Sequence, residues 1–164
     1  MPHTGDRGGV CPQDYLHRSG YRLLTEAEWE FAARAGTTTA RFFGLSRDLL
    51  PEYVWSTESS RNARTLPVAR LKPNDLGLFD MLGNAWEWCL DRRQSYPTEL
   101  DTIVIDQEGR HLVVDDSTAR TRRGGSFTYD AASVRSACRG DVSYFPMQRR
   151  DSVGFRVART LPHV

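Results

Sequence analysis

Two carboxylates seven residues apart, Asp80 and Glu87, have the chemistry to hold a cation. They belong to the stretch 77–91, GLFDMLGNAWEWCLD, which has a Gly-Asn pair between them. The alternation that follows this pair favours a strand with Trp86 and Trp88 on one face and Glu87 on the other. The tryptophan face would form the centre of the core, because two buried indoles remove a large apolar area from water. A carboxylate on the opposite face needs a partner, and a cation would serve.

Thiol chemistry is not indicated by the cysteines. The chain has three of them, Cys11, Cys89 and Cys138, which lie far apart and lack CxxC or metal-ligand spacing. An odd number of cysteines does not suggest a disulfide framework either. The pattern therefore favours buried, small apolar side chains over a redox centre.

The composition predicts one domain over residues 1–164, a length sufficient for a sizeable core. The net charge of +1 implies no strongly acidic or basic partner. Nine arginines lie between residues 120 and 159, but aspartates are interleaved with them. A salt-bridged surface is therefore favoured over a nucleic-acid face. The sequence shows no apolar run of membrane-spanning length and no signal peptide, which predicts a cytoplasmic location by default.

The elements that must position these residues are short. A helix is predicted over Glu26–Ala35, because Thr25 and Glu28 form a capping box and Gly36 can end the helix in a left-handed conformation. Residues 1–13 are predicted to be a loop or a poorly ordered end, since glycine, proline and polar residues dominate them. Strands are predicted over Val68–Leu71, Ser133–Arg139 and Val153–Arg159, with a hairpin whose arms are Asp101–Asp106 and His111–Asp115.

Three blocks of the sequence together resemble the formylglycine-generating enzyme family, also called sulfatase-modifying factors. They are YRLLTEAEWEFAARAG (21–36), GLFDMLGNAWEWCLD (77–91) and RRGGSF…VRSACRG…VGFRVART (122–160). Their order and spacing fit the family over roughly residues 11–160. The segments CPQDYLHRSGYRL and PVARLKPNDLGLFDM are most similar to bacterial members attached to signalling proteins, including Ser/Thr kinases.

This resemblance implies an α+β, C-type-lectin-like fold. Such a fold has small twisted antiparallel sheets, few helices and much irregular loop. The resemblance also implies a truncated member, because full-length members have a further N-terminal half. A sheet edge left open in this way would favour dimerisation or a second polypeptide.

The family's calcium site is the metal site that the resemblance carries over to this sequence. The side chains of Asp80 and Glu87 and the main-chain carbonyls of Gly83 and Ala85 would bind Ca²⁺, which prefers such oxygen ligands. The alternative is an ordinary turn and strand in which backbone N–H groups hold both carboxylates. Two carboxylates are few for a cation cage, and both interpretations stay open.

The family's catalytic metal sites do not carry over. In formylglycine-generating enzymes, a cysteine pair shortly after GGS binds copper and attacks the substrate cysteine. Here Tyr129 stands at the first of these positions and no cysteine follows until Cys138, so the two close thiolates that Cu(I) needs are missing. Iron-dependent relatives use a His-x3-His-x-Glu set, and the four histidines here lack that spacing. We therefore expect neither copper nor iron.

These features favour a non-catalytic domain that binds a ligand or a protein, within a bacterial signalling protein or complex. Its partner would be another protein or peptide, or a second copy of the chain, and not nucleic acid. The alternative is an oxidoreductase that converts a substrate cysteine to formylglycine in sulfatase maturation, or a related metal-dependent oxidase, which would need the missing half.

Two loops, 128–133 and 141–151, would form the recognition face, since aromatic and methionine side chains contribute strongly to interfaces. The alternative for these side chains is packing beneath a long loop. The residues expected to contact the ligand are Tyr129, Asp130, Tyr144, Phe145 and Met147.

Overall fold

The computed structural model describes residues 9–10, 14–60, 64–96, 113–114, 118–141, 145–146 and 148–162. Much of this part of the chain is loop and turn, which confirms the predicted α+β class with few helices and small sheets. No helix within it is both long enough and apolar enough to cross a membrane. In chain order, the elements are β1 (Gly9–Val10), η1 (Tyr15–His17), β2 (Gly20–Leu23), α1 (Glu26–Arg34), α2 (Leu50–Tyr53), α3 (Thr57–Ser60), β3 (Trp86–Arg92), β4 (Val113–Val114), β5 (Arg120–Arg123), β6 (Val153–Phe155) and β7 (Val157–Thr160).

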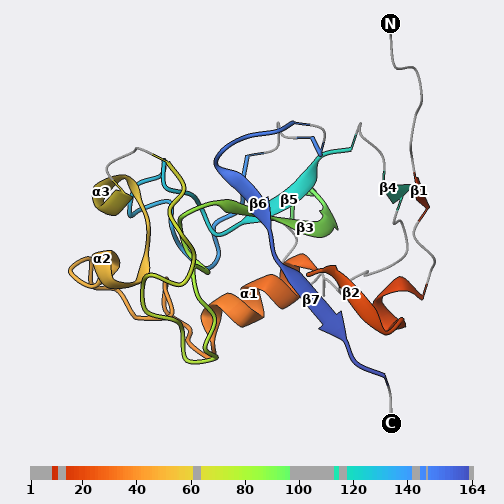
Figure 1. Ribbon diagram of the computed structural model, residues 1–164, viewed down its shortest axis with the longest axis horizontal. Helices are drawn as coiled ribbons and strands as arrows, with labels where there is room; N and C mark the ends of the chain where they lie inside the picture. Colours follow the sequence, from red (N-terminus) through yellow and green to blue (C-terminus); the bar gives the residue numbers. More distant parts are fainter. Residues whose placement is uncertain are drawn as a thin grey trace, which may run out of the picture.

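The strands described form three small sheets. In the largest, β3 lies between β5, which runs antiparallel to it, and β6, which runs parallel to it. The two-stranded sheets pair β2 with β7 and β1 with β4, both antiparallel. Figure 1 shows that the chain runs from β6 directly into β7, so these strands connect the two larger sheets. The predicted strand Val153–Arg159 is thus confirmed as two strands that separate at Arg156.

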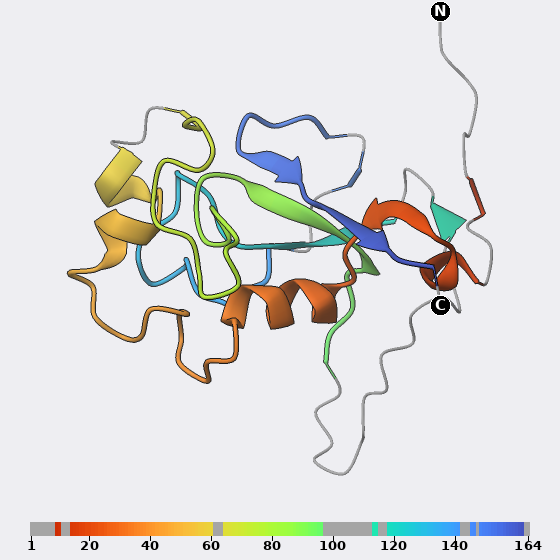
Figure 2. The ribbon, with the colours of Figure 1, turned by 60° about the horizontal axis from the view of Figure 1, so that its bottom comes forward.

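The predicted helix Glu26–Ala35 is confirmed as α1, which ends one residue earlier. Thr25 and Glu28 form the predicted capping box, in which each side chain accepts a hydrogen bond from the other residue's N–H. Ala35 already takes the left-handed conformation with φ of 47°, and Gly36 follows with φ of 86°. The helix packs against β3 and β5 (Figure 2), so it supports the largest sheet.

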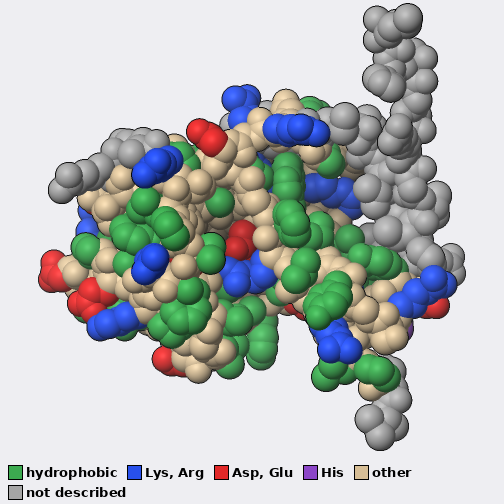
Figure 3. All heavy atoms as spheres, in the orientation of Figure 1, with side chains coloured by type: hydrophobic (Ala, Val, Ile, Leu, Met, Phe, Trp, Pro, Cys, Tyr) green, Lys and Arg blue, Asp and Glu red, His purple; other side chains and the backbone are tan. Residues whose placement is uncertain are grey.

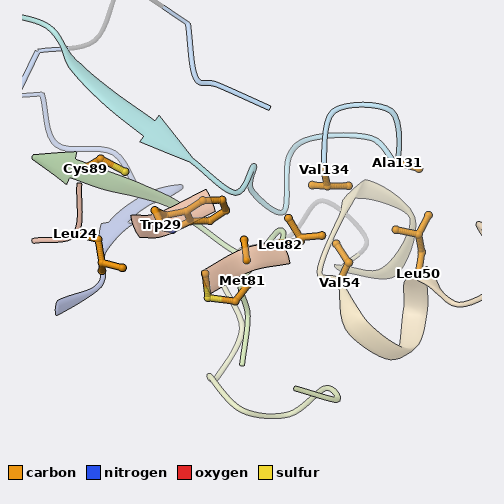
Figure 4. Close-up of a cluster of buried hydrophobic side chains, with 10 residues drawn as sticks. Leu24, Trp29, Leu50, Val54, Met81, Leu82, Cys89, Ala131 and Val134 are labelled. Atoms are coloured by element: carbon orange, nitrogen blue, oxygen red, sulfur yellow. The ribbon is translucent and has the colours of Figure 1, made fainter. Parts of the chain in front are cut away.

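The main core lies on the opposite face of β3 from the predicted one. Trp86 is 2% exposed and Trp88 is partly buried, but neither belongs to this cluster, and the guanidinium carbon of Arg122 lies 5.5 Å from each of their ring centres. Figure 4 shows the indole of Trp29 from α1 in the middle of the core, near Cys89 of β3. The prediction that the tryptophan pair forms the core's centre is wrong, because α1 supplies that indole and covers the Cys89 side of β3. The core residues are Leu24, Trp29, Ala33, Leu50, Val54, Met81, Leu82, Cys89, Ala131 and Val134.

Two other strand predictions are wrong. Ser133–Arg139 is a series of turns, because the carbonyl of Asp130 accepts the N–H of Ser133 and bends the chain. Val68–Leu71 is irregular, and its Ala69 has a φ of 59°, which a strand does not allow.

The prediction of a loop or a poorly ordered end for residues 1–13 is wrong at Gly9–Val10. These two residues form β1, which pairs with Val113–Val114. The rest of 1–13 lies outside the described residues, and so does the predicted hairpin apart from Val113–Val114.

Candidate functional site

A hollow with a volume of about 630 Å³ opens between β6 and two loops, residues 65–69 and 77–80. Figure 3 shows it as a depression with an acidic and a basic side chain inside and apolar side chains around it. We call this space the β6 hollow, and its lining includes Leu66, Val68, Asp80, Glu87, Phe155 and Arg156.

Asp80 offers an open acceptor in this hollow. Its backbone has a φ of 56°, which is uncommon for a residue other than glycine. Its Oδ2 accepts the N–H of Ala69 at 2.7 Å. Its Oδ1 is buried and accepts no hydrogen bond from the part of the chain that is described. Because an unpaired buried carboxylate oxygen is costly, Oδ1 is a place for a cation or a hydrogen-bond donor.

Asn84 holds the loop 65–69, which forms one wall of the hollow, through two hydrogen bonds to Leu66. Its Oδ1 accepts the N–H of Leu66 at 2.9 Å, and its Nδ2 donates to the carbonyl of Leu66 at 3.1 Å. Gly83 before it has a φ of 79°, and a Cβ there would lie 2.3 Å from the carbonyl oxygen of Trp55. The Gly-Asn pair thus has two structural roles: glycine permits the close approach to Trp55, and asparagine holds the loop 65–69.

Glu87 is held by two residues distant in sequence. Its Oε2 accepts the indole N–H of Trp29 at 2.7 Å and the Nε–H of Arg156 at 3.0 Å, and its Oε1 accepts from Nη2 of Arg156 at 2.8 Å. Arg156 Nη2 also donates to the carbonyl of Phe79 at 2.8 Å. Sequence reasoning missed Arg156, although its inward position in the alternating VGFRVAR strand was a signal for it.

The residues predicted to bind Ca²⁺ converge in part. Asp80, Ala85 and Glu87 line the hollow, whereas Gly83 is buried beside Trp55. Asp80 Oδ1 fits a cation, while the charge of Glu87 is already balanced by Arg156. Within the described ranges, no three His, Cys, Asp or Glu side chains are grouped as a metal site. The remaining oxygen ligands would have to be main-chain carbonyls.

Tyr129 and Asp130 belong to a turn, residues 128–134, on the other face of β3. The ring of Tyr129 is partly buried and packs edge-on against Trp86, with ring centres 5.2 Å apart. Asp130 is exposed, and its Oδ1 accepts the N–H of Ser133 at 3.0 Å. A hydrogen bond from the Ser133 side chain and, after it, the one from the Ser133 N–H lower the pKa of Asp130 below its usual value. Tyr129 therefore takes part in packing, and Asp130 shapes the turn.

The two predicted recognition loops lie apart in Figures 1 and 2. The 128–134 turn lies near α3, where the N–H of Thr57 donates to the carbonyl of Tyr129 at 3.0 Å. The described residues of 141–151 lie over β6, and Phe145 among them is 37% exposed. Tyr144 and Met147 are outside the described residues.

The described thiols are not arranged as reactive groups. Cys89 is 1% exposed in the core, and burial raises the pKa of its thiol well above the ordinary value. Cys138 is partly buried, which also raises its pKa. Both are free cysteines, and Cys11 lies outside the described residues. The raised pKa of each thiol disfavours the thiolate, which is the form that acts as a nucleophile.

Comparison with known proteins gives consistent matches. Residues 7–161 match the sulfatase-modifying factor enzyme 1-like domain. A formylglycine-generating enzyme from Streptomyces coelicolor is 33% identical over 158 residues, covering 88% of this chain and 48% of that protein. Serine/threonine-protein kinase pkn1 from Chlamydia pneumoniae is 40% identical over 147 residues, covering 90% of this chain and 22% of the kinase.

The solved structure of Treponema denticola variable protein 1 has a TM-score of 0.73 to this chain at 33% identity. The match covers 88% of this chain and 49% of that one. The predicted C-type-lectin-like fold is confirmed by such neighbours. The chain spans less than half the length of each of these relatives.

Proposed function

Because the chain belongs to the sulfatase-modifying factor enzyme 1-like family, we propose that it is a binding domain of that family which does not itself oxidise a substrate cysteine. The observation that carries this proposal is the packing of Tyr129 against Trp86, at the position where the family resemblance would put a catalytic thiol. A Cu(I) centre needs two soft ligands close together, and of the two described thiols Cys89 is enclosed in the core and Cys138 is partly buried.

The β6 hollow is the place where such a domain would take its ligand. Its volume is in the range of ordinary ligand sites, and apolar walls surround a few fixed polar groups. The kinase similarity supports a role for this domain as the recognition part of a larger signalling protein or complex in the cytoplasm, with a protein or peptide as partner.

A Cu(I) titration against a competing chelator tests the absence of a thiol centre. We expect binding no tighter than that of the Cys11→Ser, Cys138→Ser double variant, because the remaining thiol, Cys89, is 1% exposed. Tight one-to-one Cu(I) binding that the double variant loses would contradict the proposal and favour the oxidoreductase alternative.

A structural Ca²⁺ ion at Asp80 is a second proposal, supported by the buried Oδ1 of that residue. Asp80 would hold the ion together with the carbonyls of Gly83 and Ala85 and a remaining lone pair of Glu87, and the bound ion would supply positive charge to the hollow. Calcium at 100 times its Kd should stabilise the fold by about 2.7 kcal/mol. Thermal unfolding in CaCl₂ and in EGTA should therefore differ for the wild type and not for Asp80→Ala; equal Tm values in the two buffers would refute the ion.

A further inference from the structure

One edge of the largest sheet is open. β6 pairs with β3 on one side, and among the described residues no strand lies on its other side. The parallel register sets Trp86 against Val153 and Trp88 against Phe155, and the N–H of Trp86 donates to the carbonyl of Ser152. In a parallel pair this pattern turns the main-chain groups of Ser152 and Gly154 toward β3. The N–H and carbonyl of Phe155 therefore point away from the sheet.

Apolar side chains flank this open edge. Phe155 is 68% exposed, and across the hollow Val68 is 74% exposed and Phe79 37% exposed. Val157, the first residue of β7, lies on the same side of the chain as Phe155 and is 54% exposed. Apolar groups gathered beside an unpaired strand edge are typical of sites where an extended polypeptide adds as a further strand.

The rim of the hollow is basic. Arg64 and Arg70 are exposed at the two ends of the loop 65–69, and Arg159 is exposed on β7. Within the described part of the chain, none of these three arginines forms an ion pair. Arg64 and Arg70 directly adjoin the lining residues Thr65 and Ala69, and with Arg156 in the lining they give three guanidinium groups against the two carboxylates of Asp80 and Glu87. Arg159 lies farther along the chain on β7, with its guanidinium carbon 5.8 Å from the ring centre of Tyr21. Figure 3 shows basic and apolar side chains around the hollow on this face of the molecule. This excess of positive charge complements an acidic partner.

We infer that an extended, acidic segment of a partner polypeptide adds as a strand to the open edge of β6. Its main chain pairs with the N–H and carbonyl of Phe155, and one of its apolar side chains enters the hollow between Val68 and Phe79. Its acidic side chains face Arg64, Arg70 and Arg159. This inference rests on the proposed binding function and names the chemical class of the ligand.

Selection from a random linear peptide library displayed on phage tests the inference. The folded protein is the target, and the Phe155→Ser variant is used for counter-selection. We expect the enriched peptides to alternate acidic and apolar residues. Enrichment of basic or uncharged peptides, or no enrichment above the counter-selected background, would overturn the inference.

The best peptide is then synthesised with a fluorophore and measured by anisotropy. Phe155→Ser and Arg159→Glu should each weaken binding about tenfold, as expected for an apolar anchor and a facing charge. Phe31→Ser is the matched control, because Phe31 is 74% exposed on α1, and it should leave binding unchanged. N-methylation of alternate peptide bonds in the ligand should also weaken binding about tenfold, since it removes strand hydrogen bonds without altering the protein.

Equal binding of the N-methylated peptide would exclude strand addition. A concentration-dependent dimer in light scattering that Phe155→Ser dissociates would show that a second copy occupies the edge, and would also overturn the inference. Neither result bears on Cu(I) binding, so failure of the acidic-peptide inference is distinct from failure of the non-catalytic proposal.

Discussion

The β6 hollow and the 128–134 turn both border β3, but their polar groups are used differently. In the turn, the carbonyls of Ala131 and Val134 accept hydrogen bonds from the buried guanidinium of Arg41. The N–H of Ala131 donates to Glu58, and Tyr129 closes the turn against the sheet. The turn is thus tied to the scaffold by its own main chain and filled by an aromatic ring.

The hollow instead keeps polar groups for which the described residues provide no partner. Asp80 Oδ1 accepts no hydrogen bond from the described residues, and the main chain of Phe155 points away from its sheet. Around them, the hydrogen bonds of Asn84 and of the Glu87–Arg156 pair fix the walls. The difference teaches that one scaffold can combine a turn whose main chain is hydrogen-bonded to it with a hollow whose lining keeps an unpaired carboxylate oxygen among the described residues.

The largest expected effect comes from breaking the Glu87–Arg156 pair. Arg156→Met leaves a largely buried carboxylate without its counter-ion, which should lower the free energy of unfolding by about 3 kcal/mol. Urea denaturation measures this change. Arg159→Met on the exposed side of β7 is the control and should change it by less than about 0.5 kcal/mol. Equal effects of the two substitutions would show that the pair does not hold the hollow together.

Tyr129→Ala should have the next largest effect and should act on stability alone. Loss of the ring contact with Trp86 and of the partly buried ring should cost about 2 kcal/mol. Tyr129→Phe keeps the ring and should stay close to the wild type. Affinity for an acidic peptide should not change in either variant; a loss of affinity without a loss of stability would make Tyr129 a ligand contact.

Asn84→Gly should have a smaller effect, because it removes two hydrogen bonds while keeping the positive φ accessible. A destabilisation of about 1 kcal/mol is expected, together with faster hydrogen exchange at the amide of Leu66. Thr65→Ala in the same loop is the control and should alter neither. Unchanged exchange at Leu66 in Asn84→Gly would mean that other contacts hold the wall.

Alkylation of the thiols tests whether Cys89 and Cys138 are reactive in the folded protein. Because burial raises the pKa of Cys138, iodoacetamide at pH 7 should modify it more slowly than it modifies free glutathione, and the rate should rise with pH. Cys89 should not react until the protein unfolds. The measurement uses the Cys11→Ser variant, in which Cys89 and Cys138 are the remaining thiols, and peptide mass mapping identifies the modified residue. A Cys138 that reacts faster than glutathione at pH 7 would indicate an activated thiol.

The elements predicted most accurately are those that depend on residues close together in the sequence. The capping box of Thr25 and Glu28 lies within four residues, and it located α1 to within one residue. The alternation of Val153–Arg159 located β6 and β7, although it could not show the change of sheet at Arg156. The alternation after the Gly-Asn pair also located β3, which runs from Trp86 to Arg92.

What the sequence could not show depends on contacts between distant residues. Glu87 and Arg156 are 69 positions apart, and Trp29 and Glu87 are 58 apart. Alternation shows which residues of β3 share a face, but it does not show which face a helix covers. The sequence therefore predicts the core on the tryptophan face, whereas α1 covers the other face. Ser133–Arg139 alternates like a strand, but the N–H of Ser133 donates to the carbonyl and to the side chain of Asp130, and these hydrogen bonds form a turn.

The most direct test of the central claim is a search for formylglycine in a cysteine-containing peptide incubated aerobically with the protein, copper and a reductant. Mass spectrometry reads the conversion, and a reaction without protein sets the background. With Tyr129 packed where a thiol would act, the peptide should keep its cysteine at the background level. Repeated turnover that Cys138→Ser abolishes would contradict the account and make this chain an oxidase.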